Sequence, residues 1–334
     1  MSAVKKVSGS LLYFMLQSLA FLAYSGIAYS QNLKHADSVN IASGFSLKTN
    51  DENITCQKSS GTSYKASRSS SSSEITINAK TILEKMIAQI QNIQNLRYSL
   101  YATERVNGNY LTAKSDIKII VFPRKTYLKN PLRKLEVLYA EGENDNNALV
   151  NPGRFPYFTL SLDPHKSIMR KGQHHTIDDL GFTSISKIIS RSIPKDSKVF
   201  EKTFFYQGIV EWKGYQCYKI YNEFKDFNYV NHTCKKGETV RSISNKYNCG
   251  DYRILEKYTE IKIGEELKEG TIISVPNYYA SKTILYIDIK TYLPLSIKIF
   301  DNEGLYEVYE FRNLLVNKPF AKDEFSRGFN EYDF

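Results

Sequence analysis

Residues 283–316 read TILYIDIKTYLPLSIKIFDNEGLYEVYEFRNLLV, and this stretch decides the fold. Apolar and polar residues alternate in three runs, 283–289, 293–300 and 305–316, with short turns at 290–292 and 301–304. Alternation with a period of two is typical of strands, and successive strands joined by short turns pair antiparallel. The segment therefore predicts a three-stranded antiparallel meander.

The chain before this meander predicts one helix followed by many strands. Asn78 is a plausible cap for a helix with apolar residues at the i, i+3, i+4 spacing. These are Ala79, Ile82, Leu83, Met86, Ile87, Ile90 and Ile93. From residue 97 to about 151 the period becomes two, with a hairpin turn at Asn107-Gly108-Asn109. Further strands are expected at 198–210 and 215–224, and a second short helix at 184–192.

This order of elements predicts an α+β fold. One highly curved antiparallel sheet, a half-barrel, carries the helices on its concave face. The interruption of the strand rhythm at residues 229–277 predicts a small domain inserted into a hairpin of the large one.

The composition of the 334 residues is that of a globular protein, with 42% hydrophobic and 24% charged residues. The 25 Tyr and 18 Phe favour strands and suit apolar cavities and sugar faces. The formal charge of +10 is spread along the chain without a nucleic-acid motif, so we expect no nucleic-acid partner. A diffuse positive field suits anionic polymers and membrane surfaces, or simply keeps a soluble protein dispersed.

The first 30 residues predict export. Lys5 and Lys6 precede an apolar run at 11–28, and Ala28-Tyr29-Ser30 is a small-x-small cleavage site. This pattern is typical of a secretory signal peptide, with an uncleaved anchor helix as the rival interpretation. We expect the periplasm or cell envelope, and no transmembrane helix after cleavage. Residues 31–75, which end in the serine run 69–73, predict a flexible tether.

The inserted segment predicts strand, helix, helix and strand in fewer than 50 residues. Its Lys-Gly-Glu-Thr-Val at 236–240, Ser-Ile-Ser-Asn-Lys-Tyr at 242–247 and Leu-Lys-Glu-Gly-Thr-Ile-Ile-Ser-Val-Pro at 267–276 resemble a LysM domain. The resemblance implies binding of peptidoglycan glycan through N-acetylglucosamine, in a groove between two loops. One loop is Gly237, Glu238, Thr239 and Val240, and the other is Tyr258, Thr259, Glu260 and Ile261. The usual Asn-Pro near the second helix is missing, so the alternative is a module that keeps the fold without the sugar.

Four cysteines, Cys56, Cys217, Cys234 and Cys249, are compatible with disulfides in an exported chain. Cys234 and Cys249 stand where the LysM family usually has core aliphatics. They form either a disulfide or two buried thiols, since a free Cys behaves as a small hydrophobe. Cys56, inside the tether, is either a free thiol or a pin between tether and domain.

A second resemblance covers 76–228 and 278–334. Residues 285–295, 301–311, 121–125 and 172–175 resemble the outer-membrane lipoprotein carrier superfamily, and more narrowly an uncharacterised secreted bacterial family thought to share its fold. The superfamily has an unclosed half-barrel whose helices cover a concave side, with an apolar cavity for acyl chains. Leu83, Ile87 and Ile90 are then expected to face that cavity, or else to be ordinary core.

No motif for catalysis, a metal or a cofactor is apparent. His174-His175 with Asp178-Asp179, and His165 nearby, form a weak metal candidate or a polar loop before the second helix. We therefore predict a non-catalytic periplasmic protein that binds peptidoglycan through the LysM module and a lipid or lipoprotein acyl chain through the half-barrel. The alternatives are a wall-associated scaffold without ligand and a LysM-targeted cell-wall hydrolase.

Overall fold

The computed structural model describes residues 77–334, so the predicted signal peptide, the tether and Cys56 lie outside the described residues. Eleven antiparallel strands form one open sheet in the order β6-β5-β4-β3-β2-β1-β13-β12-β11-β8-β7. The strands are β1 (Asn95–Val106), β2 (Asn109–Ile120), β3 (Lys125–Asn130), β4 (Leu135–Ala140), β5 (Ala148–Asn151), β6 (Leu160–Leu162), β7 (Phe204–Trp212), β8 (Tyr215–Glu223), β11 (Lys282–Asp288), β12 (Pro294–Asp301) and β13 (Gly304–Val316). The predicted meander is confirmed as β11, β12 and β13.

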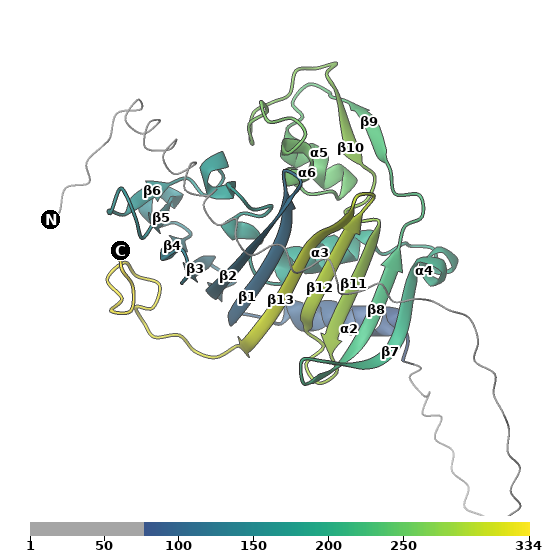
Figure 1. The fold of residues 1–334 in the computed structure, drawn as a ribbon, viewed down its shortest axis with the longest axis horizontal. Coiled ribbons are helices and arrows are strands. Elements are labelled where there is room, and N and C mark those ends of the chain that lie inside the picture. The colour runs from purple at the N-terminus through teal and green to yellow at the C-terminus, as the bar shows by residue number, and fades with distance from the viewer. Residues whose placement is uncertain (1–76) are drawn as a thin grey trace, which may run out of the picture. The chain divides into compact units, whose positions relative to one another are not determined.

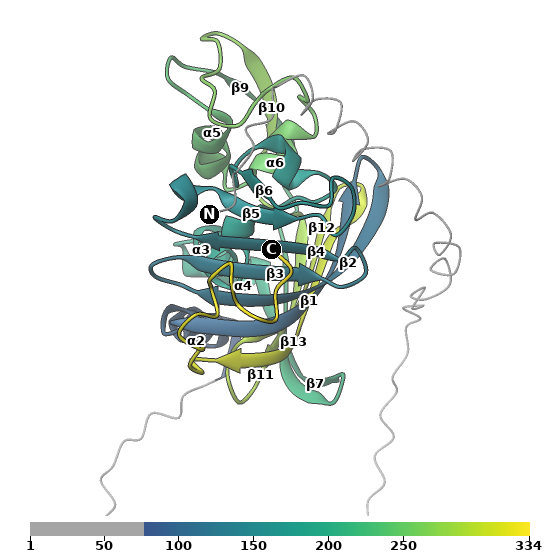
Figure 2. The same ribbon diagram turned by 90° about the vertical axis from the view of Figure 1, so that its left-hand side faces the viewer.

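The sheet is strongly bent. Figure 1 shows β7, β8 and β11–β13 face on, whereas Figure 2, a quarter turn away, shows β2–β5 side by side across the view. The two halves meet where β1 pairs with β13, strands more than 190 residues apart in the chain, with Leu100 opposite Phe311. Within residues 77–334 the order of strands ends at β6 and β7, so this part of the chain leaves the sheet open at both edges.

Three helices accompany the sheet, namely α2 (Ala79–Gln91), α3 (Thr183–Ser192) and α4 (Ser197–Thr203). The predicted cap of α2 is confirmed, since the Asn78 side chain accepts a hydrogen bond from the Thr81 amide at 3.0 Å. The second predicted helix is α3. The strand predicted at 198–210 is wrong in its first part, because the Asp196 side chain caps α4 through the Lys198 and Val199 amides at 2.7 and 3.2 Å.

The main core lies between these helices and the sheet. On α2, Ile82, Leu83 and Met86 are at most 1% exposed and pack with Phe182 and sheet residues such as Ile220. The other face of β1–β4 is covered by the C-terminal segment 317–334, whose Tyr332 ring stacks on Tyr127 with centroids 3.8 Å apart. Among residues 77–334, no helix is both long and apolar enough to cross a membrane.

Residues 229–277 leave the main sheet. They form β9 (Tyr229–Thr233), α5 (Val240–Tyr247), α6 (Asp251–Leu255) and β10 (Ile272–Pro276), and β9 pairs only with β10. Thr239 caps α5 reciprocally with Ser242. A separate apolar cluster fills this βααβ body, made of Cys234, Val240, Ile243, Cys249, Ile254, Ile273 and Val275. The body interrupts the chain between β8 and β11, which are neighbours in the main sheet.

The cysteines in the described region are buried free thiols. Of the two alternatives for Cys234 and Cys249, the structure has the buried thiols, and the disulfide is not formed. Burial raises the pKa of the Cys249 thiol to about 12 and that of Cys217 to about 11. These thiols therefore act as apolar core side chains.

A buried ion pair joins the inserted body to the sheet. Arg253 of α6 lies 2.7 Å from the Asp301 carboxylate at the end of β12, and both side chains are at most 3% exposed. Asp301 also accepts a hydrogen bond from Arg105 of β1. The Arg253 guanidinium lies 3.4 Å from the centre of the Tyr306 ring and donates to the Tyr279 carbonyl oxygen at 3.0 Å. One carboxylate thus holds two cations from distant parts of the chain.

The edge strand β7 is irregular. Its register against β8 shifts between Tyr206 and Ile209, around Gly208, whose φ of 89° lies in the left-handed region. On either side of this bulge, Phe205 and Ile209 are 40% and 51% exposed.

We expect Asp301→Asn to lower the free energy of unfolding by about 3–5 kcal/mol, because it leaves two buried guanidinium groups without their shared counter-charge. Urea unfolding measures the loss. Asp323→Asn, at an exposed position, is the matched control and is expected to stay within about 0.5 kcal/mol of the unaltered protein. Equal stability of the two variants would contradict the structural role of the Asp301 pair.

Candidate functional site

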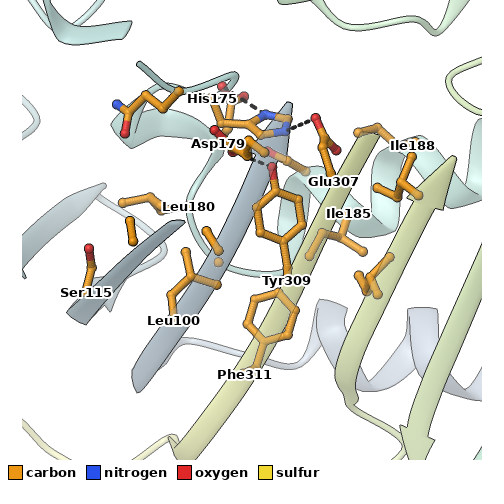
Figure 3. Close-up of a pocket in the computed structure, with 18 of the residues that line it drawn as sticks. Leu100, Ser115, His175, Asp179, Leu180, Ile185, Ile188, Glu307, Tyr309 and Phe311 are labelled. Carbon is orange, nitrogen blue, oxygen red and sulfur yellow. Dashed lines mark hydrogen bonds and ion pairs between the residues drawn. The ribbon is translucent and has the colours of Figure 1, made fainter. Parts of the chain in front are cut away.

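A cavity of about 190 Å³ lies between α3 and the inner face of the sheet. Its wall is mostly aliphatic and aromatic, and it draws on both halves of the sheet (Figure 3). The apolar lining includes Leu100, Leu111, Leu128, Leu135, Ile185, Ile188, Ile189, Leu285, Ile297, Ile299 and Phe311. A wall of this kind favours an apolar guest over water, since water needs two to four polar partners.

The helix that lines the cavity is α3. The α2 residues expected from the sequence to face the cavity, Leu83, Ile87 and Ile90, are not among its lining residues. Leu83 and Ile90 are at most 5% exposed in the main core, and Ile87 packs against that core while partly exposed. The second alternative, ordinary core, therefore describes these residues.

Two carboxylates lie at one end of this apolar cavity. Glu104 of β1 and Glu307 of β13 are direct cross-strand partners, and they are 7% and 0% exposed. Like charges opposite each other in a sheet repel, and buried charges need partners. Figure 3 shows the polar side chains Glu307, His175 and Asp179 gathered at one end, with Leu100 and Phe311 away from them.

His174 contacts both carboxylates. Its backbone amide donates to Glu104 at 2.8 Å, and its Nδ1 lies 2.6 Å from Glu307 Oε1. Its Nε2 lies 2.9 Å from the Arg105 carbonyl oxygen, which can only accept, so Nε2 donates. The ring is stacked between Tyr252 of α6 and Tyr306 of β13, with centroids 4.1 and 4.4 Å away. The inserted body thus supplies one wall of the His174 site.

His175 faces the cavity as a cation. Its Nε2 lies 3.4 Å from Glu307, and its Nδ1 lies 3.8 Å from Asp179. Burial alone would lower the pKa of His175, but attraction to the carboxylates of Glu307 and Asp179 outweighs it and raises that pKa well above its usual value. Burial opposes the charge on both carboxylates too, yet their interactions with the histidines hold the pKa of Glu307 and of Asp179 far below the ordinary range.

Two tyrosines donate further hydrogen bonds to the buried carboxylates. Tyr279 donates to Glu307 at 2.9 Å and lies 3.2 Å from His175 Nε2, while Tyr309 donates to Glu104. Burial, reinforced by these carboxylates, raises the pKa of both phenols well above the usual value. Each hydroxyl is therefore a neutral donor at this end of the cavity.

The loop that carries the histidines is held by Arg124. Its guanidinium donates to the carbonyl oxygens of Ile177 and Leu180 at 3.1 and 2.8 Å. The loop includes two 3-10 turns, η2 (Ser167–Arg170) and η3 (Ile177–Asp179). A third 3-10 turn, η1 (Asn144–Asn146), lies outside this loop, between β4 and β5. Arg124, which belongs to the segment 121–125, thus holds the part of the loop that directly follows residues 172–175.

The remaining members of the predicted His/Asp cluster point elsewhere. His165 is exposed and lies 3.2 Å from Asp178, outside the cavity lining. In the part of the chain that the structure describes, no group of three or more His, Cys, Asp or Glu side chains could hold a metal ion. The cluster is a charge-neutralising network around Glu307.

The two predicted glycan loops border the core of the inserted body. In the first, Val240 is fully buried, and Glu238 lies 2.7 Å from His232 Nε2. In the second, the Tyr258 hydroxyl accepts a hydrogen bond from the Ser274 amide at 2.8 Å, and Ile261 packs on the core. Gly237, Thr239, Thr259 and Glu260 complete the loops. Of these, Thr239 is partly exposed and the other three are exposed.

Comparison with known proteins gives limited matches. Residues 93–227 match the family model described as "Protein of unknown function (DUF1571)". A search of curated proteins found no match.

Among solved structures, LprF from Mycobacterium bovis is 10% identical, with a TM-score of 0.34 over 73% of this chain and 94% of that one. The Mycobacterium tuberculosis lipoprotein LppX is 11% identical, with a TM-score of 0.33 over 72% and 98%. A putative outer membrane lipoprotein-sorting protein domain from Vibrio parahaemolyticus is 10% identical, with a TM-score of 0.31 over 74% and 95%.

The polar network predicts a stability loss at alkaline pH. A group whose pKa is raised on folding stabilises the fold fully below its unfolded pKa, about 6.5 for histidine. That contribution is lost as the pH rises through the folded pKa. Urea unfolding is therefore expected to show falling stability from about pH 7 upward, with a shallower fall in His175→Gln.

His165→Gln is the control for this pH series, because His165 is exposed and outside the network. It is expected to keep the slope of the unaltered protein. If His175→Gln kept that slope as well, the charged state assigned to His175 would be refuted.

Proposed function

We propose that this protein is a non-catalytic binding protein of the bacterial cell envelope, which holds the apolar chain of a lipid or lipoprotein in the cavity beneath α3. The observation that carries the proposal is the cavity of about 190 Å³ with its apolar wall. For comparison, an engineered apolar cavity of about 150 Å³ stays dry and binds benzene. A hollow of this size supports a ligand-binding function rather than that of a scaffold, whose core would be filled by its own side chains.

The wall chemistry supports an acyl chain as the guest. Ile185, Ile188 and Ile189 present aliphatic side chains from α3 that are only partly buried by the protein itself. Transfer of a chain from water onto this surface is favourable by about 0.8 kcal/mol per buried methylene. The polar groups at one end carry no substrate-activating motif, and their hydrogen bonds go to one another.

Filling the cavity is expected to weaken binding. Ala113 of β2 lines the cavity, so Ala113→Trp places an indole where the guest would lie. Displacing two or more methylenes weakens binding of a fluorescent monoacylglycerol at least about tenfold. Fluorescence titration measures the affinity, and mass spectrometry measures co-purifying lipid.

Ala88→Trp is the matched control, since Ala88 is exposed on α2 and absent from the cavity wall. It is expected to bind like the unaltered protein. If Ala113→Trp bound the probe as tightly as the unaltered protein, the cavity would not be the binding site.

A second activity, glycan binding at the inserted body, is supported by its βααβ order and its separate core. Val240 is buried, so it offers a sugar only its backbone. The exposed contacts are Gly237, Thr259 and Glu260, at which backbone amides and small side chains can hydrogen-bond a sugar. Residence at peptidoglycan also agrees with the formal charge of +10, which suits anionic wall polymers.

The glycan proposal predicts that Thr259→Arg reduces retention on purified peptidoglycan sacculi severalfold, because the bulky side chain obstructs the loop. Gln207→Arg adds the same charge at an exposed position of β7 and is expected to be retained normally. Co-sedimentation measures retention. Equal retention of both variants would exclude this loop as the sugar contact.

A further inference from the structure

A second hollow adjoins the apolar cavity. It measures about 120 Å³ and lies between α3 and the helices of the inserted body. The two hollows share lining residues, among them His175, Ile188, Tyr279 and Glu307. They are therefore neighbouring compartments, one apolar and one polar, that meet at the histidine end of the cavity.

The second hollow is rich in cations. Arg170, Lys187, Arg191 and Arg241 line it from three different segments. Asp251, the carboxylate of α6, lies 2.7 Å from Arg241 and 3.8 Å from Arg170. The other two carboxylates that line the hollow, Asp179 and Glu307, already interact with the histidines.

Two of these cations have no carboxylate partner among residues 77–334. Lys187 and Arg191 stand one turn apart on α3, and within residues 77–334 neither forms an ion pair. In the described part of the chain, the Arg191 side chain donates only to the side-chain oxygen of Asn245, at 3.1 Å. The hollow therefore carries positive charge that residues 77–334 do not neutralise.

Arg170 also lacks a close carboxylate partner in the region that the structure describes, and its side chain is buried. Its side chain is 6% exposed, its Nε is buried without a hydrogen-bond partner among residues 77–334, and its Nη2 lies 3.8 Å from Asp251. Burial lowers the pKa of Arg170 more than the nearby carboxylates raise it. A buried guanidinium with an open donor is a costly arrangement unless an anion completes it. The planar fork of arginine matches the oxygens of phosphate and carboxylate.

We propose that the ligand is an anionic amphiphile, whose chain occupies the apolar cavity and whose phosphate or carboxylate head occupies the second hollow against Arg170, Lys187 and Arg191. This inference rests on the proposed function and adds the class of headgroup. Since α5 and α6 form one wall of the second hollow, the inserted body takes part in holding the head.

The test compares three probes with the full-length protein by titration calorimetry, below the concentrations at which micelles form. They are dodecyl phosphate, the uncharged monoacylglycerol of equal chain length, and inorganic phosphate. Dodecyl phosphate is expected to bind at least about tenfold more tightly than the uncharged probe, a gain that one hydrogen bond to a charged group supplies. Inorganic phosphate alone is expected to bind far more weakly than dodecyl phosphate.

The variant Lys187→Gln/Arg191→Gln is expected to lose this preference for the phosphate head while still binding the uncharged probe. Both positions are exposed, so folding is preserved. Lys198→Gln/Lys202→Gln removes an exposed pair of cations at the same spacing on α4 and is expected to keep the preference.

Each other outcome has a distinct meaning. Equal affinity for the charged and uncharged probes overturns the headgroup site but leaves the acyl cavity standing. Phosphate binding as tight as dodecyl phosphate binding makes this a free-anion site and overturns the amphiphile. If Lys187→Gln/Arg191→Gln still prefers dodecyl phosphate to the uncharged probe, the assignment of these two residues to the headgroup site is wrong. Failure of all three probes to bind refutes the proposed function itself.

Discussion

The structure depends on the neutralisation of two carboxylates buried opposite each other. Glu104 and Glu307 face the same side of the sheet where β1 pairs with β13, at the junction of its two halves. Side by side in a dry environment, two such charges would repel and push the strands apart. The protein counters this by placing His174, His175 and two tyrosines over them. The loop that delivers the histidines then closes one end of the cavity.

The same network connects three parts of the chain that are distant in sequence. The His174 ring lies between Tyr252 of the inserted body and Tyr306 of β13, and Arg253 lies on the Tyr306 ring. Arg253 in turn shares Asp301 with Arg105 of β1. The inserted body is therefore fixed to the sheet by stacked rings and a buried ion pair, and its position is coupled to that of the histidine loop.

Much of the fold could be predicted from the sequence because the signals were local. The meander, the Asn78 cap and the extent of the inserted βααβ body follow from periodicity and turn residues. The helix α4 was predicted as part of a strand because its adjacent apolar residues Val199 and Phe200 lead directly into the strand that begins at Phe204, although Asp196 is a suitable helix cap. The choice of α3 as the cavity wall depends on tertiary packing, which a helical pattern in α2 cannot reveal.

Only part of the candidate site could be predicted from the sequence. His174 and His175 stood out, but their partner Glu307 lies more than 130 residues further on. A signal did exist. Glu307 is in phase with the cavity-lining Tyr309 and Phe311, and Glu104 is in phase with Leu100 and Ala102. A carboxylate at an inward position of a strand is a sign of a buried network.

The irregular edge strand β7 has a consequence for how molecules of this protein meet. An open sheet exposes the amide and carbonyl groups of its outermost strands, which can recruit a strand from another copy and start aggregation. At one border the strand β6 has only three residues, and at the other the bulge at Gly208 breaks the ladder midway along β7. Neither edge strand offers a long, straight template for pairing with another strand. The sheet can therefore remain open without promoting aggregation between copies of the protein.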